Sequence, residues 1–334
     1  MAALAEQLAA WIVRATGEAG ARVASLRPLA GGASRESWAF DLVRADGRVQ
    51  HLVLRRDPAG RTLQGSRREE FLILRAAAAA GVPVPAVHWC EEDATILGSP
   101  FFVMDFVAGE TLARRLLRDA EYAPARTALP EQLADALVRI HQMDPHDPAL
   151  AFLAAPAAGT SPAAAELSRW EDIYRAATPD PHPAIELALR WLAPRVPAAP
   201  PDRRVVHGDF RIGNVIFGTE GLRAVLDWEL TRIGDPMEDL GWLCVRAWRF
   251  GAPAPVGGLC ERERLFAAYE RAGGVHVDAA AVRWWEVLGN FKWATICIMQ
   301  ARSVLDGAVK SLELASLGRR VAEMEIELMA LTEE

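Results

Sequence analysis

One stretch of the chain carries polar side chains in an order that suits phosphoryl transfer. It reads VVHGDFRIGNVIF over residues 205–217 and is followed by AVLDWE over residues 224–229. Asp209 comes first, Asn214 lies five residues later, and Asp227 lies thirteen residues after that. Apolar residues flank each polar cluster, which predicts a loop between short strands. Phosphoryl transfer needs a carboxylate beside the attacking hydroxyl and oxygen ligands for Mg²⁺, and these residue types supply both.

Asp209, Asn214 and Asp227 are expected to have different roles in that reaction. Asp209 is expected to orient the attacking hydroxyl and to accept its proton as a general base. Asn214 and Asp227 are expected to hold Mg²⁺, which neutralises charge on the β- and γ-phosphate oxygens. A His-x-Asp pair on a loop is by itself more often structural than catalytic. The prediction therefore depends on the joint spacing of Asp209 with Asn214 and Asp227.

Other polar residues nearby have structural interpretations that fit better than catalytic ones. His207 is expected to hold the loop backbone rather than to transfer protons. Asp235 and Asp239 lie in GDPMEDLG (234–241), where Gly-Asp-Pro before a helical pattern predicts a turn and an N-terminal cap rather than a pair of metal ligands. His141 lies on an apolar helical face and is expected to be a core histidine.

The elements that must position this stretch change in kind along the chain. An amphipathic helix is predicted at the N-terminus, and strand-type runs at 36–43 and 51–56 flank a hairpin-type turn. A helix is predicted over 67–80, where a glycine and two prolines then end it. Further apolar runs lie near 86–91 and 101–107, and helical patterns lie near 130–143, 163–177, 183–194, 237–249, 261–273, 278–305 and 311–331.

This order predicts an α+β fold with two lobes. Residues 1–107 are expected to form a small antiparallel β N-lobe with a leading helix, and residues 108–334 a larger, mainly helical C-lobe. Hydrophobic residues make up 51% of the chain and charged residues 24%, which is typical of a soluble globular protein. The net charge of -7 argues against a protein whose main task is to bind nucleic acid.

The cysteines and the lack of long apolar runs predict a cytoplasmic protein. No C-x-x-C spacing occurs, so free thiols are expected rather than a zinc site or a disulfide framework. No apolar run reaches the roughly 18–20 residues that span a bilayer, and the N-terminus has no secretory-leader pattern. We therefore expect neither a membrane nor a nucleic-acid partner. The cysteines are Cys90, Cys244, Cys260 and Cys297.

The polar stretch resembles a known family. The H-G-D-x-x-x-x-N run, the later D-W-E and the G-D-P-x-x-D-L-G segment resemble the aminoglycoside phosphotransferase family, whose members are relatives of the protein kinases. Within this family the chain is most similar to the phosphotransferase domain that is fused to some acyl-CoA dehydrogenases. The resemblance spans residues from about 27 to 302. It implies a bilobal protein-kinase-like fold, Mg²⁺ as cofactor, and ATP or GTP as co-substrate.

The resemblance also implies roles for residues of the N-lobe. LAGGAS (29–34) resembles the nucleotide-positioning loop, in which Gly31, Gly32 and Ser34 would lie close to the phosphates. Arg55 occupies the place where kinases carry the lysine that touches the α- and β-phosphates. Arginine offers a bidentate fork in place of a point charge, so the geometry of its phosphate contact must differ.

Two further nucleotide contacts follow from the same resemblance. Glu70 would form an ion pair with the arginine that replaces the kinase lysine, although the neighbouring Glu69 is an alternative. PFFVMDFV, from residue 100 to 107, resembles the hinge strand of the family. Met104, Asp105 and Val107 would then lie against the adenine.

The leading hypothesis is a kinase that transfers the γ-phosphoryl group of ATP or GTP to a small-molecule hydroxyl, a phosphotransferase with an alcohol acceptor. A protein kinase fits less well, because Gly234 comes only seven residues after Asp227 and leaves little room for a peptide-docking loop. The alternatives are a non-catalytic nucleotide-binding pseudokinase and an aminoglycoside- or macrolide-type antibiotic kinase. A metal-dependent hydrolase would need further ligands that the sequence does not offer. The oligomeric state stays open.

The acceptor is expected not to be a true aminoglycoside. Residues 240–334 carry 11 Lys+Arg against 12 Asp+Glu, whereas a polycationic substrate calls for several unpaired carboxylates. Acidic residues of the last helix are expected to face solvent. A neutral or anionic hydroxylated molecule, such as a hydroxylated acyl compound, fits better. The acidic residues are Glu323, Glu325 and Glu327, and the residues expected near the acceptor are Trp284, Trp285, Lys292, Trp293 and Arg302, with core packing the alternative for the tryptophans.

Overall fold

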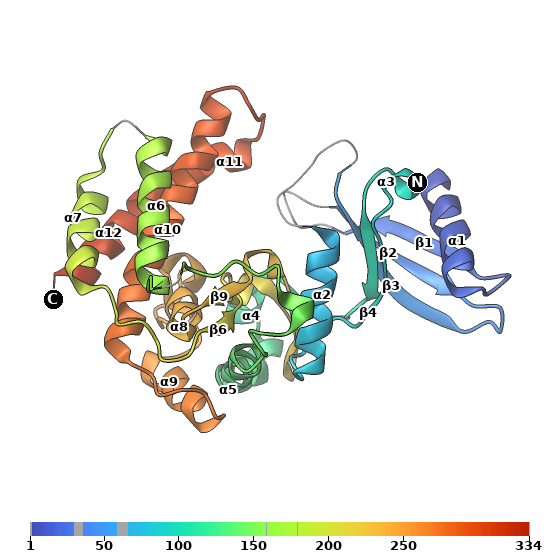
Figure 1. Ribbon diagram of the computed structural model, residues 1–334, viewed down its shortest axis with the longest axis horizontal. Coiled ribbons are helices and arrows are strands. Elements are labelled where there is room, and N and C mark those ends of the chain that lie inside the picture. The colour runs from blue at the N-terminus through green and yellow to red at the C-terminus, as the bar shows by residue number, and fades with distance from the viewer. Residues whose placement is uncertain (1, 30–35, 59–65, 158, 179, 334) are drawn as a thin grey trace. The chain divides into compact units, whose positions relative to one another are not determined.

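The computed structural model describes residues 2–29, 36–58, 66–157, 159–178 and 180–333 (Figure 1). Contacts divide the chain into two compact units. The first comprises residues 1–109, 146–152 and 223–229, and the second comprises residues 110–145, 153–222 and 230–334. The first unit therefore takes in two short segments from later in the sequence, and one of them contains Asp227.

The first unit is built on a five-stranded antiparallel sheet with the strand order β1-β2-β3-β5-β4. Side chains on successive residues of a strand point to opposite faces, and two helices cover these faces (Figure 1). The strands are β1 (Arg22–Pro28), β2 (Glu36–Val43), β3 (Val49–Arg56), β4 (Val87–Glu91) and β5 (Phe101–Asp105), and the helices are α1 (Ala2–Thr16), α2 (Arg67–Ala79) and the one-turn α3 (Ala94–Leu97).

The two neighbouring phenylalanines of β5 show how the sheet is covered on both sides. Phe101 packs edge-on against Trp11 of α1, with ring centres 4.7 Å apart, and Phe102 packs against Phe71 of α2, at 6.2 Å. Both phenylalanines are fully buried. β3, which carries Arg55, lies beside β5 and is held in register with it, with Arg55 opposite Phe102.

The second unit is mainly helical, and its short strands lie near the polar stretch. β6 pairs with β9, and β7 pairs with β8. The strands are β6 (Arg204–Val206), β7 (Val215–Gly218), β8 (Gly221–Val225), whose last residues belong to the first unit, and β9 (Arg232–Gly234). The helices are α4 (Ala113–Arg118), α5 (Ala123–His141), α6 (Pro162–Ala177), α7 (Pro183–Leu192), α8 (Pro236–Cys244), α9 (Arg262–Arg271), α10 (Ala279–Leu305), α11 (Leu312–Leu317) and α12 (Val321–Thr332), with short 3₁₀ turns between them.

Helix α10 is the central element of the second unit. It packs against α6, α7, α8, α11 and α12, and α6, α7 and α12 are seen beside it in Figure 1. The crossing with α8 is close, because a Cβ atom on Gly241 would lie 2.6 Å from the Cβ of Trp285 and 2.9 Å from the backbone nitrogen of Glu286. A side chain larger than glycine would separate the two helices. This crossing brings α8 and α10 together behind the polar stretch.

The predicted α+β class, with a small antiparallel sheet followed by a mainly helical part, is confirmed. Two predicted helices were too long. The pattern at 237–249 ends as α-helix at Cys244, because Val245 turns to φ -55° and ψ 136°, and a 3₁₀ turn follows. The pattern at 311–331 is divided into α11 and α12 by a 3₁₀ turn at Gly318–Arg320.

The cysteines are free thiols, as predicted, although Cys90 is only half-buried. Burial raises the pKa of the Cys90 and Cys260 thiols to about 11. Among the described residues, no helix is both long enough and apolar enough to cross a membrane.

Candidate active site

The His-Gly-Asp loop follows β6 directly and is anchored by a buried carboxylate of α8. Oxygens of Asp239 accept hydrogen bonds from the backbone nitrogens of His207 and Gly208, each at 2.8 Å. Gly208 has φ +78°, and a Cβ atom there would lie 2.5 Å from the carbonyl oxygen of Leu230. Only glycine fits this turn, so the loop depends both on Gly208 and on the carboxylate behind it.

Asp239 is itself held in place by a buried histidine. His141 Nε2 lies 3.0 Å from the carboxylate, and His141 Nδ1 lies 2.7 Å from the hydroxyl of Tyr269. Burial alone would raise the pKa of Asp239, but the hydrogen bond and charge of His141 outweigh it and lower this pKa. Asp235 caps α8 by accepting from the backbone nitrogen of Met237 at 2.9 Å. These contacts give His141, Asp235 and Asp239 the structural roles expected of them.

Asp209 lies at the end of this loop with hydrogen-bond donors at both carboxylate oxygens. The indole Nε1 of Trp242 donates to Oδ1 at 2.7 Å, and the amide of Asn214 donates to Oδ2 at 2.6 Å. The Nε of Arg211 lies 3.2 Å from Oδ1 and 3.4 Å from Oδ2. The side chain is 14% exposed. The carboxylate is therefore fixed in orientation while part of it stays accessible.

Asn214 is joined to Asp209 by both of its amide hydrogens. Its Nδ2 donates to the backbone oxygen of Asp209 at 3.0 Å as well as to the carboxylate. The 3₁₀ turn Ile212–Asn214 brings the two residues together over a short stretch of chain. With the amide nitrogen engaged, the amide oxygen is the atom that could bind a cation.

Three predicted side chains of the first unit, those of Arg55, Glu70 and Asp227, lie in one cluster. Arg55 Nε on β3 lies 2.6 Å from a carboxylate oxygen of Glu70 on α2, and Arg55 Nη2 lies 3.8 Å from Asp227. Glu70 also pairs with Arg67 within α2. Glu69 faces elsewhere, because its carboxylate accepts from the backbone nitrogen of Ser66 at 3.1 Å in a capping box at the start of α2. Of the two alternatives, Glu70 is the one that contacts Arg55.

Asp227 has an unusual backbone for a residue with a side chain. Its φ is +67°, in the left-handed region. Aspartate tolerates this region better than most residues, and such outliers gather at functional sites. The next residue, Trp228, is buried and donates its indole hydrogen to the carbonyl oxygen of Val225 at 3.2 Å, which fixes the turn. The side chain of Asp227 is 35% exposed.

The predicted hinge residues lie at the end of β5. Met104 is buried, and the backbone nitrogen of Asp105 donates to Ala86 at 2.8 Å. The carboxylate of Asp105 lies 2.7 Å from His88 Nε2. Val107, half-buried, follows the strand. The predicted loop residues Gly31, Gly32 and Ser34 lie outside the described residues.

This arrangement was compared with known proteins. Residues 25–285 match the model of a family described as the phosphotransferase enzyme family, APH. The chain belongs to this family. The resemblance seen in the polar stretch is thereby confirmed, and the chain is a phosphotransferase.

Curated relatives of this phosphotransferase carry acyl-CoA dehydrogenase names. Acyl-CoA dehydrogenase family member 10 of Mus musculus is 35% identical over 200 residues, which are 59% of this chain and 18% of that protein. Acyl-CoA dehydrogenase family member 11 of Gallus gallus is 30% identical over 302 residues, which are 84% of this chain and 38% of that protein. The chain thus spans less than half the length of these relatives.

Solved structures share the fold over nearly the whole chain. One is a protein of Ralstonia eutropha named as an aminoglycoside phosphotransferase. It is 25% identical, with a TM-score of 0.79 and 98% of each chain covered. The phosphotransferase APH(4)-Ia, in a ternary complex with AMP-PNP and hygromycin B, is 17% identical. It has a TM-score of 0.62 and covers 98% of this chain and 99% of its own, so this second likeness concerns the fold alone.

Sequence reasoning missed two of the partners of Asp209 in this phosphotransferase. Trp242 and Arg211 both contact its carboxylate. A signal for Trp242 was present, since it lies three residues after Asp239 on the same helix. Side chains with this spacing share a helix face, so a residue next to the loop anchor could reach the loop.

A cluster of indole rings and cations surrounds this contact. The rings of Trp242 and Trp248 lie 5.3 Å apart, and those of Trp248 and Trp293 lie 4.8 Å apart. The guanidinium of Arg211 lies 4.6 Å from the ring centre of Trp248, and the ammonium of Lys292 lies 4.3 Å from that of Trp242. We call these five residues the tryptophan–cation cluster.

Other residues expected near the acceptor belong to the core or the surface. The indole of Trp284 donates to the backbone of Leu192 at 3.0 Å, and that of Trp285 donates to Asp235 at 3.2 Å, so both are core residues. Arg302 is exposed and pairs with Asp306 at 3.1 Å. The expectation that Glu327 faces solvent is wrong.

Glu327 is 8% exposed and joins a buried ion network. Its carboxylate lies 2.8 Å from Arg249, which also contacts Glu286 at 3.0 Å. Two other acidic residues of the last helix, Glu323 and Glu325, are more exposed to solvent than Glu327. Glu323 pairs with Arg320 at 3.2 Å, with about half of its side chain exposed.

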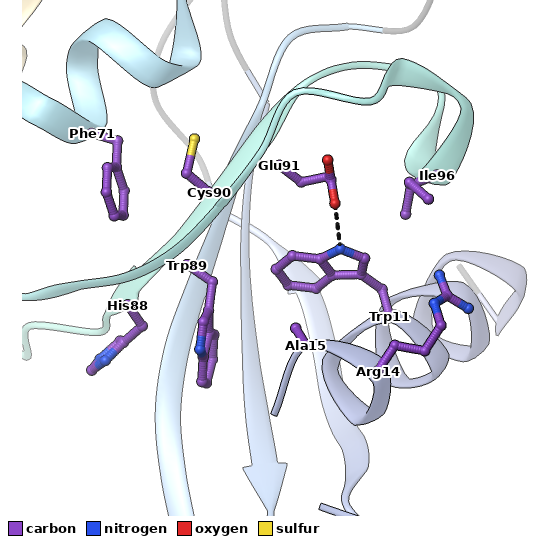
Figure 2. Close-up of a pocket in the computed structure, with 9 residues that line it drawn as sticks. All are labelled: Trp11, Arg14, Ala15, Phe71, His88, Trp89, Cys90, Glu91 and Ile96. Atoms are coloured by element: carbon purple, nitrogen blue, oxygen red, sulfur yellow. Dashed lines mark hydrogen bonds between the residues drawn. The ribbon is translucent and has the colours of Figure 1, made fainter. Parts of the chain in front are cut away.

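A pocket of about 550 Å³ lies in the first unit, beside α1 and β4 (Figure 2). Trp11 donates its indole hydrogen to Glu91 at 2.9 Å at its edge. None of the predicted site residues lines it, although His88 of its lining contacts Asp105. Its lining residues are Trp11, Arg14, Ala15, Phe71, His88, Trp89, Cys90, Glu91 and Ile96.

Proposed function

We propose that this phosphotransferase is a Mg²⁺-dependent kinase that transfers the γ-phosphoryl group of ATP or GTP to a hydroxyl of a small apolar or anionic molecule. The observation that carries the proposal is the setting of Asp209. Its carboxylate is held by Trp242 and Asn214 and is surrounded by the tryptophan–cation cluster.

Asp209 acts as the base in this proposal. The acceptor hydroxyl oxygen forms a bond to the γ-phosphorus, the bond from that phosphorus to the β,γ-bridging oxygen breaks, and the hydroxyl proton moves to the Asp209 carboxylate. Because donors already fix both carboxylate oxygens, the base needs no reorganisation before it accepts the proton.

Residues of the first unit are proposed to bind the nucleotide. Arg55, held by Glu70, would place its guanidinium on the α- and β-phosphates. Backbone groups around Met104, Asp105 and Val107 would meet the base of the nucleotide. Gly31, Gly32 and Ser34 would lie along the phosphates. The fold neighbours APH(4)-Ia and the aminoglycoside 2'-phosphotransferase IIIa were solved with AMP-PNP and with GDP, respectively, which supports a nucleotide co-substrate without deciding between adenine and guanine.

The chemistry of the available donors fits Mg²⁺. Asn214 has an amide oxygen free of the contact to Asp209, and Asp227 has a partly exposed carboxylate. Mg²⁺ is usually held by one or two carboxylates together with phosphate oxygens and water, and not by an all-protein cage. No group of three or more His, Cys, Asp or Glu that could hold a metal occurs within the described part of the chain. When bound, Mg²⁺ would neutralise charge on the β- and γ-phosphate oxygens.

The charge around Asp209 favours an acceptor that is not a polycation. Arg211 lies in the cluster beside the base with 23% of its side chain exposed, and indole rings supply apolar surface. A guanidinium at this position disfavours a polyamine and favours an acidic group. Carboxylates of the same unit, such as Glu286 and Glu327, are engaged by arginines. The curated relatives are named for acyl-CoA compounds, which supports an acyl compound as the acceptor class.

A kinetic panel tests the proposal. Hydroxyacyl thioesters, free hydroxy acids and aminoglycosides are compared with Mg·ATP and Mg·GTP, with the Asp209→Ala variant as the control for background hydrolysis. We expect phosphorylated product from a hydroxylated acyl compound and none above background from aminoglycosides. Efficient phosphorylation of a kanamycin-like compound, with kcat/KM at or above about 10⁴ M⁻¹s⁻¹, would favour the antibiotic-kinase alternative. Nucleotide binding without turnover on any acceptor would favour the pseudokinase.

A further inference from the structure

The base is supported by a chain of contacts that begins at a buried lysine. The ammonium of Lys292 lies 3.3 Å from the carbonyl oxygen of Gly208 and 4.3 Å from the ring centre of Trp242. The indole of Trp242 then donates to Asp209 Oδ1 at 2.7 Å. Lys292 and Trp242 are each 4% exposed. One cation thus contacts both the loop before Asp209 and the side chain that binds its carboxylate.

We propose that Trp242 is a positioning residue for the base and that Lys292 acts through Trp242 and the Gly208 carbonyl. The inference rests on the proposed role of Asp209 as the base. With Asn214 fixing Oδ2 and Trp242 fixing Oδ1, the carboxylate cannot rotate about its terminal bond. The oxygen that accepts the proton therefore keeps one direction.

The residue type at position 292 supports this role. Of the 37 Lys+Arg in the chain, only Lys292 and Lys310 are lysines. A compact ammonium can lie over an indole ring and also reach a carbonyl oxygen, whereas the larger planar guanidinium cannot occupy the same space. A second ring, that of Trp170 on α6, lies 5.5 Å from the ammonium.

The charge of Lys292 is balanced mainly by carboxylates other than Asp209. Arg232 pairs with Glu238 and lies 3.2 Å from Glu166, and the charges of all three act on the lysine. Burial lowers the pKa of Lys292 and Arg232 adds to this effect, while the charges of Glu238, Glu166 and, least of the three, Asp209 oppose it. Trp242 lies on α8 and Lys292 on α10. The close helix crossing at Gly241 keeps the indole ring and the ammonium 4.3 Å apart.

The first test removes the indole hydrogen and keeps an aromatic ring. Trp242→Phe is compared with Trp284→Phe, in which the lost hydrogen served only the backbone of Leu192. The assay is release of phosphate from Mg·ATP with water as the acceptor, together with the best acceptor of the panel. We expect Trp242→Phe to lower kcat by about 10- to 100-fold with the KM for ATP unchanged, as for the loss of a hydrogen bond to a charged group. Trp284→Phe should leave kcat within about twofold even if it lowers Tm.

The second test needs no turnover. In ¹⁵N-labelled protein, the indole signal that Trp242→Phe removes is assigned to Trp242. Asp209→Ala should move this signal and leave the Trp284 signal in place. Lys292→Met should move it as well and lower kcat, while Lys310→Met, which changes the other, exposed lysine, should do neither.

The outcomes separate this inference from the proposed function. A wild-type protein without any phosphate release from Mg·ATP overturns both. If Trp242→Phe turns over at the wild-type rate, or if the Trp242 indole signal does not move in Asp209→Ala, the positioning role alone is overturned. If Lys292→Met does not fold, Trp242→Phe and the indole signal still decide the role of Trp242, and Lys292→Arg, which keeps the charge, tests the compact-ammonium argument by the same readouts.

Discussion

Replacing Asp239 by asparagine should destabilise the protein and slow phosphoryl transfer together, because this carboxylate holds the His-Gly-Asp loop that carries the proposed base. Its Oδ2 accepts from the backbone nitrogen of His207 at 2.8 Å and from His141 at 3.0 Å, and its Oδ1 accepts from Gly208 at 2.8 Å. The side chain has no exposed surface, so water cannot take the place of a lost partner.

The magnitude follows from these contacts. Asparagine has one carbonyl oxygen, which can serve His207 and His141, but its NH₂ group would then face the N–H of Gly208. A hydrogen bond to a charged group contributes about 1.5–3 kcal/mol. Removing one partner from a buried charged network costs about 3–5 kcal/mol, because the remaining groups stay buried and unsatisfied. We expect a loss of unfolding free energy in this upper range for Asp239→Asn.

The same residue sets the sign of a pH effect. The pKa of Asp239 is lowered from its ordinary value, since the hydrogen bond and charge of His141 outweigh the effect of burial. The folded state therefore binds fewer protons than the unfolded state. The stabilisation from Asp239 is complete above the unfolded pKa of about 4 and is lost as the pH falls through the folded value. Asp239→Asn should lose less stability than the wild type over this acidic range.

Urea unfolding followed by tryptophan fluorescence, at neutral and acidic pH, measures these differences. Asp278→Asn is the matched control, because this exposed aspartate caps α10 through one carboxylate oxygen, and asparagine caps a helix about as well as aspartate. Equal unfolding free energies for the wild type and Asp239→Asn at neutral pH would refute the argument that this carboxylate anchors the loop.

Other substitutions test the remaining roles. Asp209→Ala should lower transfer by about 10²- to 10⁴-fold while Mg·ATP affinity stays near the wild-type value, and wild-type turnover would exclude it as the base. Asp227→Ala should remove the Mg²⁺-dependent part of the Tm increase that ATP produces, so an unchanged increase would mean that Asp227 is not a ligand. Arg55→Ala should weaken ATP binding in calorimetry, whereas Glu69→Ala should leave it unaltered. Equal affinities for these two variants would point to a different phosphate contact.

Local signals account for the elements that were predicted well. The helix expected at 67–80 is α2, Arg67–Ala79, because Ser66 and Glu69 form a capping box and Gly81 follows its end. The same capping box could have separated Glu69 from Glu70 in advance. Adjacent helix residues point about 100° apart, so when the carboxylate of Glu69 caps the helix, that of Glu70 can face β3.

Elements that depend on distant partners were predicted less well. The apolar pattern of α8 continues past Cys244, yet the helix ends there. Val245 packs against Gly289 of α10, where a Cβ atom would lie 2.6 Å from the valine side chain. Arg249 then turns inward to Glu286 and Glu327. A pattern within one segment carries no information about which other helix will meet it.

The polar stretch, the family and the α+β class could be predicted from the sequence, because these depend on residues within a few positions of one another. Asp209 and Asn214 are joined across a single 3₁₀ turn, and such a contact is encoded in spacing. The groups that reach Asp209 from other helices could be identified only in the folded protein. Lys292 lies more than eighty residues from Gly208, and the two meet because Gly241 lets α8 and α10 cross closely. Contacts of this kind depend on how helix faces pack in three dimensions, which no local pattern specifies.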